Sequence, residues 1–156
     1  MSDLAVYDVV EKEKKQYIVV KIGGEHYGID ISYIDNIVRM SKITRVPKAP
    51  SYYRGVINLR GEVVPVMSFR MKVNLPETEI TNKTRIIIIK LEPNAPVGII
   101  VDAVREVVTL SENNVDEATK SSMSNDPSYI NGIGKCGESL ISLLDLNVVI
   151  SDKETA

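Results

Sequence analysis

The chain has 156 residues, of which 44% are apolar, and a net charge of −2. These values predict one globular domain or two small subdomains, with roughly 70% of the unfolded surface buried on folding. The negative net charge argues against nucleic acid as the main partner, because phosphate binding needs a basic surface. The sequence has one cysteine, Cys136, and one histidine, His26. This excludes a Cys-based zinc cluster and argues against a His-rich metal site.

Signals for membrane insertion or secretion are not visible in the sequence. No apolar run approaches the roughly 20 residues of a membrane-spanning helix. The first residues lack the basic and apolar regions of a signal peptide. We therefore expect a cytoplasmic protein without direct membrane insertion. Residues 1–15, which end in a charged run, are expected to form a flexible N-terminal arm, and residues 151–156 a polar C-terminal tail.

The chain is expected to consist mainly of strands. β-Branched residues predict strands over 16–22 and 26–29. The segment 31–38 has apolar residues at the spacing of one helix face, with Asp30 or Ser32 as a cap; because it is β-branched, a bent strand is the alternative. Further along, the pattern predicts an extended connector at 43–50, a helical turn at 68–73, strands at 84–91, 97–101 and 104–110, a hairpin at 129–144 and a short helix or strand up to 150.

The segment Gly55–Met67 predicts a β-hairpin, because two apolar runs flank a short Arg-Gly turn. Gly61 is expected to supply the positive φ that a two-residue loop needs. Arg60 then stands at the tip, with Asn58 just before it. A polar tip also has a simpler explanation, since turns face water. Pro65 has no N–H to donate, so its strand should lie at an edge or carry a bulge there.

The two halves of the sequence resemble each other. Residues 27–38 align without a gap with 97–108, an offset of 70, and 55–69 align with 132–146, an offset of 77. Apolar positions coincide in both blocks. This predicts two similar small β units that bury faces against each other, although chance similarity between β-rich segments is the alternative. Two small barrels side by side would leave a groove between them and remove free sheet edges.

The second copy of the hairpin differs from the first at its tip. Lys135-Cys136-Gly137-Glu138 stands where the first copy has Asn58-Leu59-Arg60-Gly61. The fold therefore does not require the first tip sequence, and this favours a working role for Arg60.

Candidate catalytic groups do not assemble in the sequence. Residues 132–137 match G-x-G-x-x-G, but a strand-like run follows instead of the helix of a dinucleotide site, so a hairpin turn is predicted. Cys136 lacks a neighbouring base and is expected to line a strand or face inward. His26 is expected at the surface or rim. Acidic pairs fit caps and solvated faces better than catalytic carboxylates. We expect a binding protein, without catalytic residues, cofactor or metal.

The hairpin segment 55–66 resembles the signature G-V-x-N-L-R-G-x-[IV]-[IV]-P-[IV] of the CheW family. Residues 27–31, 43–50 and 97–102 also match this family, and the resemblance covers roughly residues 16–150. It implies a single CheW-like domain over 16–150, mainly β, with two SH3-like five-stranded β-barrels packed side by side around a shared hydrophobic core and short helices.

The resemblance also implies a function. It is that of a chemotaxis adaptor that binds the regulatory domain of the histidine kinase CheA and the cytoplasmic hairpin tips of methyl-accepting chemoreceptors, without catalysis. Through these partners it would associate with membrane receptor arrays. The implied receptor-binding residues are Ile34, Asn36, Ile37, Asn58, Arg60 and Gly61. The implied kinase-binding residues are Arg85 and Ile86.

The sequence departs from the family pattern at two places. Asn36 stands where the family usually has a glutamate, so an ion pair there is lost or moved. Ser68 replaces the aspartate of the D-L-R that follows the family's hairpin, although serine is also a fair helix cap. Two other classes remain as alternatives: an OB-like nucleic-acid-binding or other small β-barrel regulatory domain, and a hydrolase on a small barrel. One Phe and no Trp offer little base-stacking surface for the first.

Overall fold

The computed structural model describes residues 14–76, 78–93, 95–117 and 129–150. Strands dominate it, as predicted. The strands are β1 (Lys15–Ile22), β2 (Glu25–Asp30), β3 (Ile34–Arg39), β4 (Tyr53–Leu59), β5 (Glu62–Ser68), β6 (Arg85–Lys90), β7 (Pro96–Val101), β8 (Ala103–Leu110), β9 (Val115–Glu117), β10 (Ile130–Cys136) and β11 (Ser139–Leu144). The short helical elements are η1 (Ile31–Tyr33), α2 (Phe69–Lys72), η2 (Glu112–Asn114) and α3 (Leu146–Ile150).

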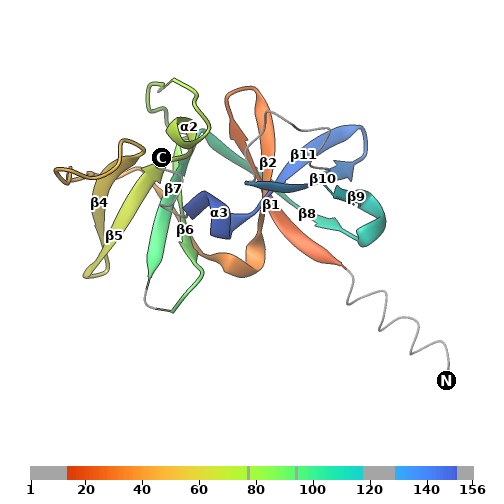
Figure 1. The fold of residues 1–156 in the computed structure, drawn as a ribbon, viewed down its shortest axis with the longest axis horizontal. Helices are drawn as coiled ribbons and strands as arrows, with labels where there is room; N and C mark the ends of the chain where they lie inside the picture. The colour runs from red at the N-terminus through yellow and green to blue at the C-terminus, as the bar shows by residue number, and fades with distance from the viewer. Residues whose placement is uncertain (1–13, 77, 94, 118–128, 151–156) are drawn as a thin grey trace.

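The strands form two sheets that lie side by side (Figure 1). One has six strands in the order β8-β1-β2-β11-β10-β9, and the other has five in the order β3-β6-β7-β5-β4. Each sheet combines the first hairpin of one sequence repeat with the later strands of the other. Both sheets contain one parallel pairing, in which Gly28 lies opposite Leu143 and Gly98 opposite Val66. These pairs are related by the offsets of 70 and 77, which confirms the internal repeat.

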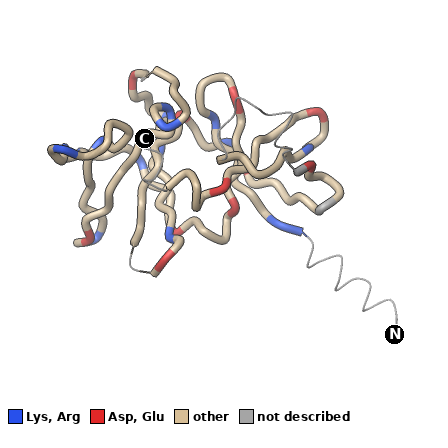
Figure 2. Tube along the Cα trace, viewed as in Figure 1, with Lys and Arg blue, Asp and Glu red and all other residues tan. Residues whose placement is uncertain are grey.

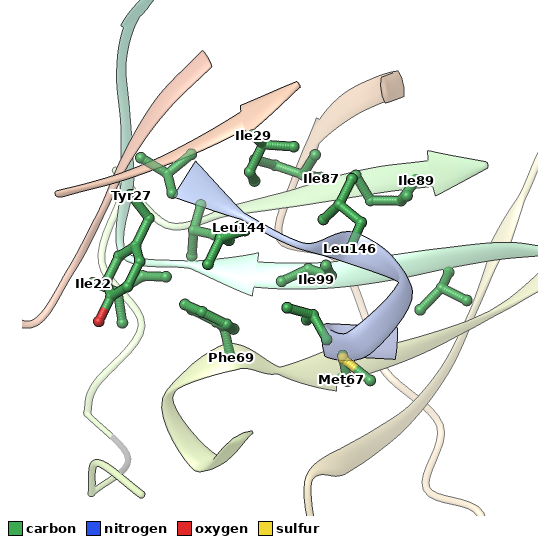
Figure 3. Packing of buried hydrophobic residues seen from close by; sticks show 14 of the residues in the cluster. Ile22, Tyr27, Ile29, Met67, Phe69, Ile87, Ile89, Ile99, Leu144 and Leu146 are labelled. Atoms are coloured by element: carbon green, nitrogen blue, oxygen red, sulfur yellow. The ribbon is translucent and has the colours of Figure 1, made fainter. Parts of the chain in front are cut away.

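Among the described residues, sixteen buried side chains from both sheets, α2, α3 and the residue before β4 form one shared core. α3 lies between the two sheets (Figures 1 and 3). Each sheet also encloses a cluster of five buried residues of its own. β6 shows why its isoleucine run is apolar on both faces. Ile87 and Ile89 point into the shared core, whereas Ile86 and Ile88 belong to the cluster of the five-stranded sheet. Two SH3-like halves around a shared core are therefore confirmed, although one sheet has six strands instead of five.

The expected helix over 31–38 is wrong, and the alternative of a bent strand is right. A 3-10 turn, η1, is capped by Asp30, whose Oδ1 accepts from the Ser32 N–H at 3.0 Å. β3 follows and pairs with β6, with a register shift between Ile34 and Asn36. This bulge inserts one residue, so Ile34 and Ile37 both pack against the shared core. In a regular strand, residues three apart would face opposite sides.

The two repeats end in turns that are held by equivalent main-chain bonds. The Ser68 N–H donates to the Tyr52 carbonyl at 2.7 Å, and the Asp145 N–H donates to the Tyr129 carbonyl at 2.7 Å. The Ser68 hydroxyl accepts from the Met71 N–H at 3.3 Å and caps α2. The predicted helical turn after the first hairpin is thus confirmed. After the second hairpin the chain forms a helix, α3, and not a strand.

Other predicted features can be placed on the same sheets. Pro65 pairs with Val56 of β4, and the pairing of β5 with β7 begins only at Val66. The expected edge strand is therefore wrong, because β5 lies between β7 and β4. The missing N–H of Pro65 is tolerated because β5 is not paired with β7 at this residue. η2 and β9 lie after β8, in a segment for which the sequence predicted no element. The predicted tail and most of the predicted arm lie outside the described residues, so the division into arm, domain and tail stays a prediction.

Candidate functional site

The tip of the β4–β5 hairpin is a two-residue turn formed by Arg60 and Gly61. Their φ angles are 55° and 82°, and positive φ at both positions matches the twist of the flanking strands. Asn58 fixes the turn, because its Oδ1 accepts from the Gly61 N–H at 3.0 Å. Asn58, Arg60 and Gly61 are all exposed to solvent. The positive φ at Gly61 was predicted, whereas the positive φ at Arg60 and the turn-forming bond of Asn58 were not.

Arg60 occupies a backbone conformation that favours glycine. The sister hairpin, β10–β11, has Gly137 with a φ of 61° at the equivalent position. A non-glycine residue in the left-handed region loses about 1–2 kcal/mol relative to its preferred conformation. The Arg60 guanidinium makes no hydrogen bond or ion pair with the part of the chain that the structure describes. The strain is therefore not offset by a contact of the Arg60 side chain within the described fold.

The predicted receptor-binding residues of β3 lie on an edge strand. Ile34 and Ile37 are half-buried at the rim of the shared core. Asn36 is also half-buried, and its Oδ1 accepts from the Ile37 N–H at 2.8 Å. β3 and β4 stand at opposite ends of their sheet, so strand pairing does not bring the β3 residues next to the hairpin tip. Both strands contribute to the same small cluster, through Val38 and Leu59.

The two predicted kinase-binding residues have different surroundings. The Arg85 side chain is half-buried, and its Nη1 donates to the carbonyls of Asn82 and Thr84 at 2.8 and 2.9 Å. It lines a shallow depression of about 400 Å³ together with Lys83 and Arg105. Ile86 is 0% exposed, inside the cluster of the five-stranded sheet. Of the two side chains, only that of Arg85 reaches the surface. The contact itself stays a prediction.

An ion pair that sequence reasoning missed connects the two sheets. Arg70 of α2 donates from Nε to Asp102 Oδ1 at 3.0 Å and from Nη2 to Oδ2 at 2.8 Å. Asp102 Oδ2 also accepts from the Gly23 N–H at 2.9 Å. Burial raises the pKa of the Asp102 carboxyl, but the bonds from Arg70 and Gly23 outweigh it and hold the pKa below its ordinary value. In the sequence, the only indication of this ion pair was that Arg70 and Asp102 each directly follow a run of buried residues.

The glycine-rich motif and the cysteine have structural positions. Residues 132–137 form the end of β10 and its turn into β11, which confirms a hairpin turn in place of a cofactor loop. Cys136 is half-buried and packs against the cluster of the six-stranded sheet. His26 is half-buried on β2. Within the described ranges, no group of three or more His, Cys, Asp and Glu side chains is placed to hold a metal ion. None of the described helices has the length and apolar composition needed to cross a membrane.

The fold defines a class of β-barrel modules, in which two SH3-like halves exchange strands around one core. In this protein the fold exposes a charged hairpin tip whose Arg60 backbone is strained. A family model described as the CheW-like domain matches residues 16–154, and the chain belongs to this family. Chemotaxis protein CheW of Bacillus subtilis (strain 168) is 39% identical over 145 residues, covering 93% of this chain and 92% of that protein. Chemotaxis protein CheW of Klebsiella aerogenes is 30% identical, with 91% and 85% covered.

A solved structure agrees with the sequence comparisons. The crystal structure of scaffolding protein TtCheW from Thermoanaerobacter tengcongensis superposes with a TM-score of 0.80 at 29% identity. The match covers 89% of this chain and 94% of that one. The fold expected from the family resemblance is therefore the fold of the chain.

Proposed function

We propose that the chain is a chemotaxis adaptor that binds the cytoplasmic tips of chemoreceptors and the regulatory domain of the histidine kinase CheA, and has no catalysis of its own. Its relatives carry the name chemotaxis protein CheW, and the match spans almost the whole of them. The solved neighbour is described as a scaffolding protein. Association with receptor arrays would follow from these two contacts.

The observation that carries the proposed receptor contact is the backbone of Arg60. Strained residues persist where function requires them, and the sister hairpin uses Gly137 at the same place. The exposed guanidinium is therefore available for a carboxylate or a carbonyl of a partner helix. Ile34 and Ile37, half-buried on the edge strand β3, would supply apolar contact to the face of such a helix. The contact of Arg85 with the kinase belongs to the same proposal.

Coupling then requires only binding. The adaptor transmits a signal when its contacts with the receptor differ between two receptor states. Each contact can be modest, because many copies held in an array raise the effective concentration of each partner.

Reconstitution tests the function directly. The protein is sedimented with a receptor cytoplasmic fragment and CheA, and each component is omitted in turn. We expect all three in the pellet and an increase in kinase activity that needs the adaptor. Recovery of the kinase with receptor alone, at the same level, would contradict the proposal.

A matched pair of variants tests the hairpin. Arg60→Ala should reduce receptor-dependent kinase stimulation, whereas Glu138→Ala, at the tip of the sister hairpin, should not. Both side chains are exposed, so both variants should fold. Equal stimulation by the two variants would remove Arg60 from the proposed site and leave the adaptor function itself untouched.

A further inference from the structure

A second feature of the surface is a cleft of about 690 Å³ on the five-stranded half. It lies between the connector that precedes β4, the helix α2 and the loop that precedes β6. A cleft of this volume is in the range of ligand pockets. None of the residues predicted to bind receptor or kinase lines it. It is therefore a separate surface of the molecule.

The connector wall of the cleft is held by main-chain bonds. The Thr44 N–H donates to the Val56 carbonyl at 2.9 Å, and the Val56 N–H donates to the Thr44 carbonyl at 2.8 Å. Gly55 makes this approach possible, because its φ is +142° and a Cβ at that position would clash with the Thr44 carbonyl. The bridge fixes the neighbouring Ile43 and Arg45, which both line the cleft.

The opposite wall is held as well. Arg70 donates to Asp102 and, from Nη1, to the Pro76 carbonyl at 2.8 Å. The loop before β6 is closed on itself, since the Thr81 N–H donates to Thr84 Oγ1 at 3.0 Å and the Thr84 N–H donates to the Thr81 carbonyl at 3.2 Å. These bonds hold the connector at Thr44 and the loop before β6 at Pro76 and Thr81. Chain segments held in this way lose less entropy on binding.

The cleft combines apolar contacts with positive charge. Its apolar lining residues are Met40, Ile43, Tyr53, Met71, Ile80 and Ile100. Ile80 is 59% exposed, although it is a large apolar side chain. The charged lining residues are Arg45, Arg54, Arg70, Glu79 and Asp102, and Asp102 is already paired with Arg70. The Arg45 side chain has no hydrogen bond or ion pair with the described part of the chain.

The sequence on the connector side of the cleft is strongly basic, although the whole chain has a net charge of −2. The loop before β6 instead contributes the acidic residue Glu79 to the lining. Residues 39–72 carry eight Lys and Arg side chains and one acidic residue, Glu62. Figure 2 shows blue segments at the end of the molecule that carries β4 and the loop before it. The fold does not demand this charge. In the sequence of the second repeat, the connector over 111–128 has four acidic residues and one lysine.

We propose that this cleft binds an acidic, amphipathic segment of a partner protein. Its apolar side chains would enter between Ile43, Met71 and Ile80, and its carboxylates would meet Arg45 at the mouth. Opposite charge at the mouth favours such a segment and disfavours basic ones. The adaptor then has a third docking surface, apart from those proposed for receptor and kinase.

Methionine methyl groups give a direct readout with an internal control. Met40 and Met71 line the cleft, whereas Met67 is 0% exposed in the shared core. The full chain is labelled with ¹³C at its methionine methyls and titrated with a synthetic peptide that carries three Leu and three Glu at helical spacing. We expect the Met40 and Met71 signals to shift and the Met67 signal to stay. A peptide with Lys in place of Glu should give no shift.

Two variants and a matched control complete the test. Arg45→Glu should weaken binding of the acidic peptide about tenfold, and Ile80→Ser should weaken it as well. Lys15→Glu changes the charge equally at an exposed residue of the other sheet and should leave binding unchanged. Absence of a shift at Met40 and Met71, equal shifts with both peptides, or an equal effect of Arg45→Glu and Lys15→Glu would overturn the proposal.

Other occupants of the cleft are distinguished in the same experiment. Shifts at Met40 and Met71 that grow with protein concentration, without peptide, would replace the proposal with self-association. Shifts with a single-stranded oligonucleotide but not with the acidic peptide would replace it with nucleic-acid binding. The measurement contains neither receptor nor kinase. Its outcome is therefore independent of the proposed coupling function.

Discussion

Arg70 and Asp102 form a two-pronged ion pair that connects the end of one repeat with the crossover of the other. Arg70 follows the strand β5, and Asp102 lies between β7 and β8, where the chain passes from one sheet to the other. Since Asp102 also accepts from Gly23 in the β1–β2 turn, one carboxylate joins segments of both sheets. The two side chains are 18% and 23% exposed, so solvent screens the pair only in part.

Asp102→Asn should lower the free energy of unfolding by about 1–3 kcal/mol at pH 7, because charged hydrogen bonds to Arg70 and Gly23 are weakened. The pKa of Asp102 is lowered by folding from an ordinary value of 3.8. Its stabilisation is therefore complete above that value and is lost as the pH falls through the lower folded pKa. Urea denaturation of both proteins as a function of pH measures this difference.

The control for this prediction is Asp35→Asn. Asp35 lies 4.0 Å from Lys90 in an exposed pair, which contributes little to stability. A difference between the wild type and Asp102→Asn that stays constant down to acidic pH would contradict the role assigned to the carboxylate.

The strain at Arg60 predicts that exchanging the residues at the two equivalent turn positions changes stability differently in the two hairpins. Arg60→Gly relieves the left-handed strain and increases the entropy of the unfolded chain, two effects of about 1 kcal/mol that oppose each other. Stability should thus change by less than about 1 kcal/mol. Gly137→Arg places a side chain at a φ of 61° and should destabilise the protein by about 1–2 kcal/mol. Thermal unfolding of both variants provides the comparison; equal losses of stability would show that the tips are not equivalent.

Gly55→Ala should be far more damaging than its small size suggests. A methyl group there meets the Thr44 carbonyl, at a φ of +142°. Removing the Thr44–Val56 bridge and forcing the backbone should lower stability by about 3 kcal/mol or more. Gly24→Ala is the control, since nothing lies within 4 Å of a Cβ at Gly24. Chemical denaturation of the two variants measures the contrast, and a Gly55→Ala protein as stable as Gly24→Ala would refute it.

Phe69→Ala should weaken both halves at once. Phe69 is 0% exposed in the shared core. Its ring makes edge-to-face contacts with the rings of Tyr27 and Tyr129, at centroid distances of 5.2 and 6.1 Å. Loss of this ring should lower stability by about 3–5 kcal/mol. Because the core belongs to both sheets, fluorescence and circular dichroism should still report one coincident transition. Two separate transitions would show that the halves unfold independently.

The sequence predicted the strands and the repeat well, because alternating apolar residues and matching offsets are local features. The helix expected over 31–38 failed for a specific reason. The bulge between Ile34 and Asn36 gives a strand the three-residue spacing of a helix face. β9 was missed because it is three residues long and has a single apolar residue, Val115. Val115 packs against the cluster of the six-stranded sheet.

The candidate site was predictable at the level of residues but not of geometry. The Arg-Gly turn was evident, whereas the bond from Asn58 to Gly61 and the strain at Arg60 depend on φ angles that the sequence does not display. The ion pair of Arg70 and Asp102 joins residues 32 positions apart. The pair forms because the strand exchange brings α2 next to the segment between β7 and β8, which holds Asp102. No local sequence pattern predicts this contact.

The exchange of hairpins between the sheets gives the molecule the topology of a strand-swapped homodimer whose two protomers have been joined end to end. Each repeat lends its first hairpin to the sheet of the other, through the parallel pairs of β2 with β11 and of β7 with β5. Domain swapping is a short route from one folding unit to two. Because both copies lie in one chain, each hairpin tip can carry its own sequence without changing the other, as Arg60 and Gly137 do.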